Sequence, residues 1–257
     1  MSAPPRILVT RSQPGAGRLG KAIRQAGFDA RVLPLIGVQP HQDGAYSRVE
    51  ETLQEFDIVL CLSSHSVAFA SDLLKTLKSK QNRGPILMAI GRATRSSLEE
   101  LGLDVTDNFT MEGSGEAAVS PESSEALLAT SSLAQPENSR ILIISGVGGR
   151  TLLADTLQQR GAEVVTLSVY QRIILSWSKA QALEASTSDG VILSSGEAVT
   201  AFNLRWPGDV SSRKIVLIVP NERVRLIAQD SGFSRVLSSE GPGDDAVISK
   251  LKQVFNE

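Results

Sequence analysis

The sequence predicts an α/β protein of two similar flavodoxin-like domains, each with a five-stranded parallel sheet and flanking helices. Three observations support this fold class. A strand–turn–helix segment occurs twice, strands alternate with helices along the chain, and 257 residues exceed the usual single domain of about 100–150 residues. The apolar share of 41% is sufficient for two packed cores.

The duplicated segment is RILVTRSQPGAGRLGKAIRQAGFDARVL at residues 6–33 and RILIISGVGGRTLLADTLQQRGAEVVTL at residues 140–167. Aligned from their first residues, the copies share Arg6/Arg140, Ile7/Ile141, Leu8/Leu142, Gly15/Gly149, Leu19/Leu153, Gly27/Gly161 and Leu33/Leu167. Two further blocks recur in the same order: LSS at residues 62–64 and 193–195, and ILMAI at residues 86–90 as IVLIV at residues 215–219. Three blocks in one order indicate a duplication.

Apolar runs give the elements in order. Strands are expected at residues 6–10, 30–33, 57–62, 86–90 and 104–106 in the first half, and at 140–145, 163–169, 190–194, 214–219 and 235–237 in the second. Helices follow most strands, as in LLADTLQQRG, where Leu152, Leu153, Thr156 and Leu157 share one face and Gly161 is placed to end the helix. Residues 108–115 and 130–139 are rich in Gly, Ser, Thr, Asn and Pro and are expected to be loops, with a helix at 121–129 between them.

The order of domains along the chain has two interpretations. Pro34 and Pro40 bracket an extended segment whose counterpart in the second copy lies at residues 168–172. The chain would then leave one domain after residue 36 and return near residue 170. The alternative is two consecutive domains that divide near residues 108–139, and periodicity leaves both open. In either case, two α/β halves predict a cleft, which is a common place for ligands.

Composition excludes several classes of protein. A net charge of −2 and a pI near 5.8 argue against a molecule-wide basic surface for nucleic acid, although a local anion site is compatible with them. The beginning MSAPPRILVT has no long apolar region, and no run approaches the ~20 apolar residues of a membrane span, so we expect a cytoplasmic protein. Cys61, the single cysteine, lies in the apolar run DIVLCL and is expected to be a buried core residue rather than part of a disulfide or metal site.

Candidate chemistry lies where strands end and helices begin, because helix N-termini at that edge of a parallel sheet favour anions. The clearest turn is SGVGGR at residues 145–150, where glycines allow close approach of the backbone and Arg150 adds donors. It is not a dinucleotide fingerprint, because Thr151 replaces the third glycine. An ordinary tight turn without a ligand explains this loop equally well.

Similar turns occur at Thr10-Arg11, Ser63-Ser64-His65, Gly91-Arg92-Ala93-Thr94, Ser194-Ser195-Gly196 and Asn221-Glu222-Arg223. Each is also explained as a helix cap, because Ser, Thr and Asn side chains accept hydrogen bonds from first-turn amides. Together they would place hydroxyls, amides and a few cations around one cleft. His65 has no second histidine nearby in sequence, which favours a hydrogen-bonding or surface role over acid–base catalysis.

These segments resemble the uroporphyrinogen-III synthase family over nearly the whole chain. The opening ILVTRSQPGAGRLGKAIRQAGFDARVLPLI is similar to the family's strand, T-R and helix ending at glycine, and LSSHSVAFA is similar to its second segment. The stretch SGVGGRTLLADTLQQRGAEVVTLSVYQR is similar to its most specific motif. Further matches are Gly91-Arg92-Ala93-Thr94, Ser195-Gly196-Glu197 and Asp245-Ala246.

The resemblance implies a discontinuous fold, with residues 1–36 and 173–257 in one domain, 40–168 in the other, and linkers at about 37–39 and 169–172. It implies a cyclising hydro-lyase that converts hydroxymethylbilane, a linear polycarboxylate tetrapyrrole, to uroporphyrinogen III with inversion of the last pyrrole. Neither a metal nor an organic cofactor is implied. We expect a monomer without nucleic-acid or membrane partners; a transient contact with hydroxymethylbilane synthase is compatible with this interpretation.

The family's site residues carry over by position. Tyr170 is the catalytic candidate, because its phenol would donate a hydrogen bond to the departing hydroxyl group; the alternative is a packing tyrosine. The binding positions are Thr10, Arg11, Ser63, His65, Thr94, Gly146, Gly149, Arg150, Ser195, Asn221 and Glu222. Ser64 and His65 replace Pro or Arg of some relatives, and Asn221-Glu222 stands where some carry Thr, so backbone amides rather than side chains are expected to bind there.

Two other functions stay open from the sequence. A cytosolic hinge-bending protein that binds or senses a small molecule would have the same duplicated α/β halves. A nucleotide-dependent enzyme is the third candidate, and the broken glycine fingerprint weighs against it.

Overall fold

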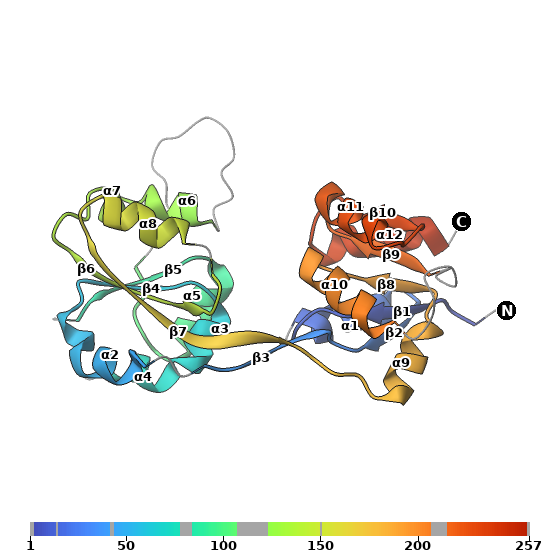
Figure 1. The fold of residues 1–257 in the computed structure, drawn as a ribbon, viewed down its shortest axis with the longest axis horizontal. Helices are drawn as coiled ribbons and strands as arrows, with labels where there is room; N and C mark the ends of the chain where they lie inside the picture. Colours follow the sequence, from blue (N-terminus) through green and yellow to red (C-terminus); the bar gives the residue numbers. More distant parts are fainter. Residues whose placement is uncertain are drawn as a thin grey trace. The chain divides into compact units, whose positions relative to one another are not determined.

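The computed structural model describes residues 3–13, 15–41, 44–77, 84–106, 123–149, 151–206 and 215–255. The chain divides into two compact units (Figure 1). Unit 1 comprises Met1–Gly37 and Ile173–Glu257, and unit 2 comprises Val38–Arg172. Each has its own sheet and its own apolar clusters on both faces of that sheet.

Unit 1 is a parallel sheet with helices on both faces. Its strands are β1 (Arg6–Val9), β2 (Asp29–Val32), β8 (Gly190–Ile192), β9 (Val216–Val219) and β10 (Val236–Ser238), in the order β10-β9-β8-β1-β2. Every pair is parallel, and this is the flavodoxin-like strand order. The helices are α1 (Gly15–Gln25), α9 (Lys179–Ser186), α10 (Gly196–Arg205), α11 (Glu222–Asp230) and α12 (Asp244–Phe255).

The helices of unit 1 cover the sheet because each buries an apolar stripe. In α1, Ala16, Leu19 and Ile23 recur at helical spacing and pack with α12 on one face of the sheet. On the other face, Phe202 of α10 and Val224 of α11 pack together in a second cluster. The strands are therefore apolar on both sides, as expected for a parallel sheet covered twice.

Unit 2 has the strands β3 (Ile36–Pro40), β4 (Ile58–Cys61), β5 (Ile86–Ala89), β6 (Arg140–Gly146) and β7 (Glu163–Ile174), in the order β3-β7-β6-β4-β5. Around the sheet lie α2 (Tyr46–Thr52), the 3-10 helix η1 (Leu53–Glu55), α3 (Ser64–Phe69), α4 (Ser71–Lys75), α5 (Arg92–Glu100), α6 (Ser124–Leu128), α7 (Ser131–Ala134) and α8 (Leu152–Gln159). Residues of α2 to α5 pack on one face of the sheet, and residues of α6 to α8 pack on the other.

The predicted duplication is visible in the strand orders. The order β2-β1-β8-β9 in unit 1 corresponds to β7-β6-β4-β5 in unit 2, and each corresponding pair carries a repeated sequence block. Within unit 1 the block of β1 and β2 comes first along the chain, whereas within unit 2 the corresponding block of β6 and β7 comes last. This difference arises because unit 2 is inserted between β2 and β8. The predicted α/β fold class with two five-stranded sheets is confirmed.

Strands β3 and β7 carry the chain between the units (Figure 1). The Leu175 amide donates to the Leu35 carbonyl at 2.9 Å, and the His41 amide donates to the Val169 carbonyl at 3.0 Å. Because residue numbers rise along one strand as they fall along the other, the pair is antiparallel. The positions expected to be linkers, 37–39 and 169–172, lie inside these two strands.

Three expectations for unit 2 were wrong. Residues 104–106 do not form a strand, although the Thr106 amide donates to the Leu87 carbonyl at 2.9 Å; the fifth strand is the antiparallel β3. The strand β7 continues to Ile174 because β3 provides a partner beyond the rest of the sheet. The expected loop at 130–139 contains the short helix α7, whose Leu133 is buried in the apolar cluster on the sheet.

The remaining expected elements of this region are partly described. The helix expected at 121–129 is present as α6, while residues 108–115 and Lys214 lie outside the described residues. Cys61 is fully buried, as predicted. In the described ranges, no helix is both long and apolar enough to span a membrane.

Candidate active site

Most of the predicted site residues lie at or just after the carboxyl ends of strands in both units, and Tyr170 lies within a strand. In unit 2 they are Ser63 and His65 after β4, Thr94 after β5, Gly146 and Gly149 at and after the end of β6, and Tyr170 on β7. In unit 1 they are Thr10 and Arg11 after β1, Ser195 after β8, and Asn221 and Glu222 after β9. Arg150 lies outside the described residues. This edge of a parallel sheet is the usual location of ligands in open α/β folds.

Tyr170 owes its orientation to an irregularity in the sheet. Along β7 and β6, Ser145 is opposite Ser168 but Gly146 is opposite Tyr170, so Val169 is an extra residue. Such a bulge re-aims the following side chain. Val169 and Tyr170 are adjacent, yet both belong to the buried cluster that faces α3 and α5. Without the bulge, strand alternation would send one of them to the opposite face.

The ring of Tyr170 is fixed on several sides. A Cβ atom built on Gly146 would lie 2.5 Å from the ring atom Cζ, so the glycine backbone is in direct contact with the ring. Phe69 stacks on the ring with centroids 5.9 Å apart and 21° between the planes, and the His65 ring lies at 5.6 Å. Only 6% of Tyr170 is exposed. The packing therefore determines where the hydroxyl group can lie.

The hydroxyl of Tyr170 meets the first turn of α3. Its oxygen lies 3.2 Å from Ser63 Oγ. Ser63 is the N-cap of α3 and accepts a hydrogen bond from the Ser66 amide at 2.9 Å. Ser66 completes a capping box, since its hydroxyl accepts from the Ser63 amide at 3.1 Å. Ser63 thus contacts both a helix start and the phenol.

The turn after β6 borders a small pocket of about 250 Å³. Gly148 has a positive φ of 72°, and the Gly149 amide donates to the Gly146 carbonyl at 3.3 Å, which closes the turn. The next helix, α8, begins without a side-chain cap from Thr151. The pocket is lined by apolar groups and by the residues Ser145, Gly146, Gly148, Gly149, Thr151, Thr166 and Ser168. Its hydroxyls and the uncapped helix start suit an anionic group.

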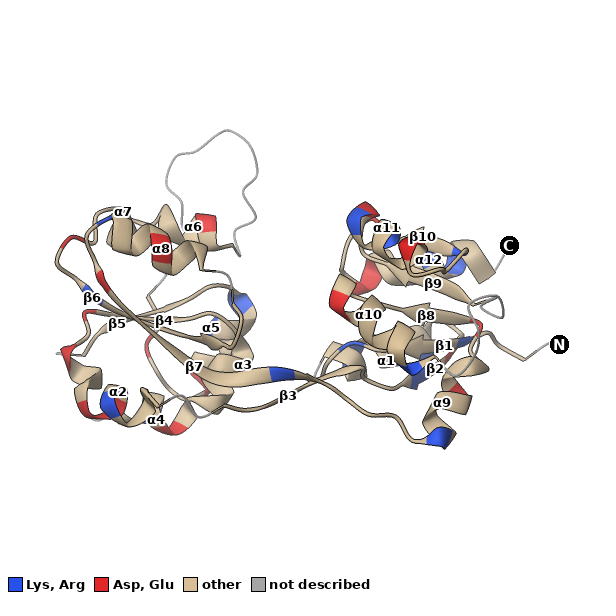
Figure 2. Ribbon diagram, viewed as in Figure 1, with Lys and Arg blue, Asp and Glu red and all other residues tan. Residues whose placement is uncertain are grey.

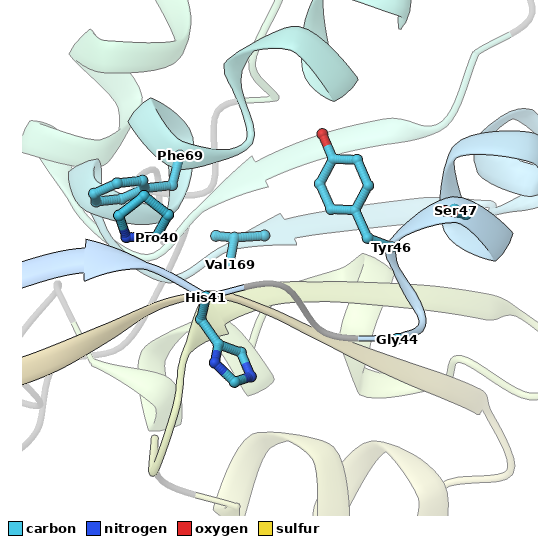
Figure 3. A pocket seen from close by; sticks show the side chains of 7 residues that line it. All are labelled: Pro40, His41, Gly44, Tyr46, Ser47, Phe69 and Val169. Carbon is cyan, nitrogen blue, oxygen red and sulfur yellow. The ribbon is translucent and has the colours of Figure 1, made fainter.

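A larger pocket of about 580 Å³ shares Phe69 and Val169 with the surroundings of Tyr170 (Figure 3). It is lined by Pro40, His41, Gly44, Tyr46, Ser47, Phe69 and Val169. Burial raises the pKa of Tyr46, and the negative charges of Glu50 and Asp72 raise it further. Figure 3 shows the rings of His41 and Tyr46 extending in opposite directions. The carboxylates of Glu50 and Asp72 would also repel an anion near Tyr46. This pocket is therefore less suited to substrate carboxylates than the turn after β6.

The predicted residues of unit 1 already have partners within the unit. The buried Thr10 hydroxyl donates to the Ile192 carbonyl at 2.7 Å. Arg11 forms an ion pair with Asp244 at 2.8 Å, and its guanidinium also donates to the Pro242 carbonyl. These side chains hold the ends of strands and the start of α12 together.

The side chains at the helix starts of unit 1 also have partners within the unit. Ser195 caps α10 by accepting from the Ala198 amide at 3.1 Å, and Asn221 caps α11 by accepting from the Val224 amide at 3.1 Å. The Glu222 carboxylate pairs with Arg225, and this hydrogen bond lowers the pKa of Glu222. Contacts with a ligand at these positions would therefore come mainly from backbone amides.

Sequence reasoning missed Phe69 and the bulge at Val169. Phe69 follows His65 by four residues, and this spacing places both on one side of α3, where they meet the ring of Tyr170. That spacing was a signal in the segment LSSHSVAFA. Thr94, in contrast, is 4% exposed on α5, so its side chain is mostly covered.

Charge is distributed over both units. Figure 2 shows acidic and basic residues on each of them. Many pair with one another, as Arg140 does with Glu55 and Glu163. In the part of the chain that the structure describes, no three His, Cys, Asp or Glu side chains gather in a way that could hold a metal ion.

Known proteins are similar to this chain in sequence and in fold. The family profile described as "Uroporphyrinogen-III synthase HemD" matches residues 17–249. The uroporphyrinogen-III synthase of Escherichia coli (strain K12) is 31% identical over 256 residues, which cover 96% of this chain and 99% of that protein. The enzyme of the same name from Salmonella typhimurium is 30% identical, with coverage of 96% and 99%.

Solved structures agree on the fold. The crystal structure of uroporphyrinogen-III synthetase from Helicobacter pylori 26695 has a TM-score of 0.60 at 15% identity, covering 97% of this chain and 99% of that one. A mutant uroporphyrinogen III synthase from Thermus thermophilus has a TM-score of 0.55 at 14% identity, covering 98% and 99%. The profile match and the identity to full-length relatives confirm the resemblance drawn from the motifs: the chain belongs to the uroporphyrinogen-III synthase family of cyclising hydro-lyases.

Proposed function

We propose that this chain converts hydroxymethylbilane to uroporphyrinogen III, with inversion of the last pyrrole ring and loss of water, and that Tyr170 is its catalytic residue. The observation that carries the proposal is the placement of the Tyr170 hydroxyl. A bulge in β7 turns it toward the start of α3, and Gly146 and Phe69 hold its ring. Family membership supports the same reaction.

The chemistry begins at the terminal hydroxymethyl group. When its C–O bond breaks, the electron pair leaves on oxygen, the proton of Tyr170 completes a water molecule, and an azafulvenium cation remains. The substituted carbon of the last ring attacks this cation to form a spiro intermediate. That intermediate fragments and recloses with the ring inverted, and the proton lost from the ring carbon at closure returns to Tyr170. Atoms balance, because the products are uroporphyrinogen III and water.

The protein's main task is orientation. Hydroxymethylbilane also closes without an enzyme to the uninverted isomer I, so the enzyme must hold the tetrapyrrole in one folded conformation. We propose that its carboxylates bind backbone amides at helix starts, including those after Ser63, Ser195 and Asn221, and at the turn of Gly146 and Gly149. This mode needs no strongly basic surface, which agrees with the net charge of −2.

Further parts of the proposal concern the state of the protein. We propose that the two domains are residues 1–36 with 173–257 and residues 40–168, and that the protein works in the cytoplasm as a monomer without a cofactor. A transient contact with hydroxymethylbilane synthase would shorten the lifetime of free substrate and so limit spontaneous closure.

The test is the identity of the product. Purified protein is incubated with freshly prepared hydroxymethylbilane, the products are oxidised, and isomers III and I are separated by chromatography. We expect isomer III to form in proportion to the protein added, while a blank without protein yields isomer I. A protein that only binds or senses the tetrapyrrole would leave isomer I as the product and would overturn the proposal.

A further inference from the structure

We infer that Ser63 is a positioning residue for Tyr170: its hydroxyl donates to the phenolic oxygen and so leaves the phenolic proton free for the departing hydroxyl of the substrate. This inference rests on the proposed function. It assigns Ser63 a role through Tyr170 instead of a direct contact with substrate.

The hydrogen bonds at the start of α3 leave the Ser63 hydroxyl able to donate to Tyr170. The Ser66 hydroxyl donates its proton to the Ser63 carbonyl at 2.7 Å and accepts from the Ser63 amide at 3.1 Å. The Ser66 amide donates to Ser63 Oγ at 2.9 Å. Among the described residues, Ser63 Oγ also meets the Tyr170 oxygen at 3.2 Å. Either hydroxyl of this contact could be the donor. The bond from the Ser66 amide uses a lone pair of Ser63 Oγ and leaves its proton available, so Ser63 can donate to the phenolic oxygen. The catalytic role proposed for Tyr170 favours donation in that direction.

The direction of this bond matters for catalysis. If Tyr170 donated to Ser63, its proton would be occupied and would have to be released before each turnover. If Ser63 donates, Tyr170 keeps its proton for the leaving group. As that proton moves, negative charge grows on the phenolic oxygen, and a hydrogen bond to a charged acceptor is stronger than one to a neutral acceptor. The two consecutive hydrogen bonds, from the Ser66 amide to Ser63 and from Ser63 to Tyr170, also strengthen each other by polarisation.

The packing of Tyr170 makes the contact with Ser63 a fixed one. Gly146 and Phe69 restrain the ring, and the reciprocal bonds with Ser66 restrain Ser63. Neither group has to be ordered when substrate binds. This preorganisation is the feature that distinguishes a positioning role from an incidental contact.

Ser63 also caps α3, so the two roles must be separated. Ser63→Thr keeps both the acceptor for the Ser66 amide and a hydroxyl proton. Ser63→Asp keeps a good capping oxygen but has no proton to give, and it would accept the proton of Tyr170. Ser63→Ala removes both the capping oxygen and the hydroxyl proton. Ser178 is a matched control, because it caps α9 in unit 1 with the same type of capping box, formed with Gln181.

The experiment measures kcat, KM, the isomer ratio and the melting temperature of each variant. We expect Ser63→Thr to stay within about threefold of the wild-type kcat. Ser63→Asp should keep the melting temperature but lose about tenfold in kcat, the effect of one hydrogen bond of ordinary strength. Its KM should rise separately, because the added carboxylate repels the substrate carboxylates proposed to bind at this helix start. Ser63→Ala should lower both kcat and the melting temperature. Ser178→Ala should lower only the melting temperature.

A double-mutant cycle gives the sharpest outcome. In a Tyr170→Phe background, Ser63→Asp should have no further effect on kcat, because the group that Ser63 positions is gone. A Ser63→Asp variant with wild-type kcat, or an equal loss with and without the Tyr170 hydroxyl, would overturn the inference while leaving the proposed function intact. Wild-type protein that yields no isomer III would instead refute the proposed function itself.

Discussion

Gly146 lies directly against the ring of Tyr170, close enough that a Cβ at position 146 would come within 2.5 Å of Cζ. The two residues are opposite each other in the pairing of β6 with β7, directly after the bulge at Val169. Glycine is therefore required at this position by the close approach of an aromatic ring. The sequence had indicated Gly146 as a substrate-binding residue, and its contact with Tyr170 gives it a second role in the same site.

Gly146→Ala should displace the Tyr170 ring and lower turnover by about tenfold or more, since a misplaced catalytic group is costly. Overpacking at this contact should also lower the free energy of unfolding by about 1–3 kcal/mol. Steady-state kinetics and denaturant unfolding measure the two effects. Unchanged turnover would show that the position of the ring does not matter.

Gly161→Ala is the matched control for that loss of stability. Gly161 also belongs to unit 2, and its positive φ of 87° makes any side chain unfavourable by about 1–2 kcal/mol. It lies at the end of α8, away from Tyr170, so turnover should be retained. The contrast between the two alanine variants separates positioning of the ring from general destabilisation.

Cys61 should be unreactive toward thiol reagents in the folded protein. It is fully buried in β4, and burial raises the pKa of its thiol to about 12. We expect no modification of native protein at neutral or mildly alkaline pH, and rapid modification once denaturant is added. Absorbance after addition of a chromogenic disulfide follows the reaction, and fast labelling of native protein would contradict the burial.

The same thiol makes stability fall at high pH. A pKa raised by folding means that the unfolded chain loses its proton first, near the ordinary value of 9.0. Its contribution is therefore fully present below pH 9 and is lost progressively between pH 9 and about 12. Cys61→Ala should show a smaller decrease in the free energy of unfolding over the accessible part of this range than the wild type, as measured by urea unfolding at several pH values.

Arg11 and Asp244 form an ion pair with only 14% and 19% of their side chains exposed. Asp244→Asn should lower the free energy of unfolding by about 1–3 kcal/mol, because it leaves the Arg11 charge partly buried without its counterion. If Arg11 serves mainly to hold α12, KM should change less than about twofold in this variant. A large rise in KM with no change in stability would instead assign Arg11 to the substrate.

Much of the fold was predictable because the strands are buried on both faces and so appear as continuous apolar runs, as in ILVT after Arg6 and DIVLCL before Ser63. The edge strand β3 was harder to predict. It contains Gly37 and ends at Pro40, which lacks an amide proton, and such residues are tolerated at the edge of a sheet. Its pairing with β7 depends on a segment far away in the chain.

The site was predictable at the level of strand ends and less so at the level of contacts. Tyr170 and Ser63 stand out as polar residues that follow apolar strands, but their contact joins positions 107 residues apart. The bulge at Val169 depends on pairing between strands and has no local signature. Likewise, Asp244, which forms the ion pair with Arg11, lies 233 residues away in the sequence.

Replacement of Tyr170 by phenylalanine tests the account most directly, because it removes one hydroxyl and leaves the ring packed against Gly146 and Phe69. We predict an unchanged fold by circular dichroism, a melting temperature within a few degrees of the wild type, and a fall in kcat for isomer III of about 100-fold or more. Isomer I from spontaneous closure should then account for most of the product. Wild-type kcat in the Tyr170→Phe variant would contradict the account.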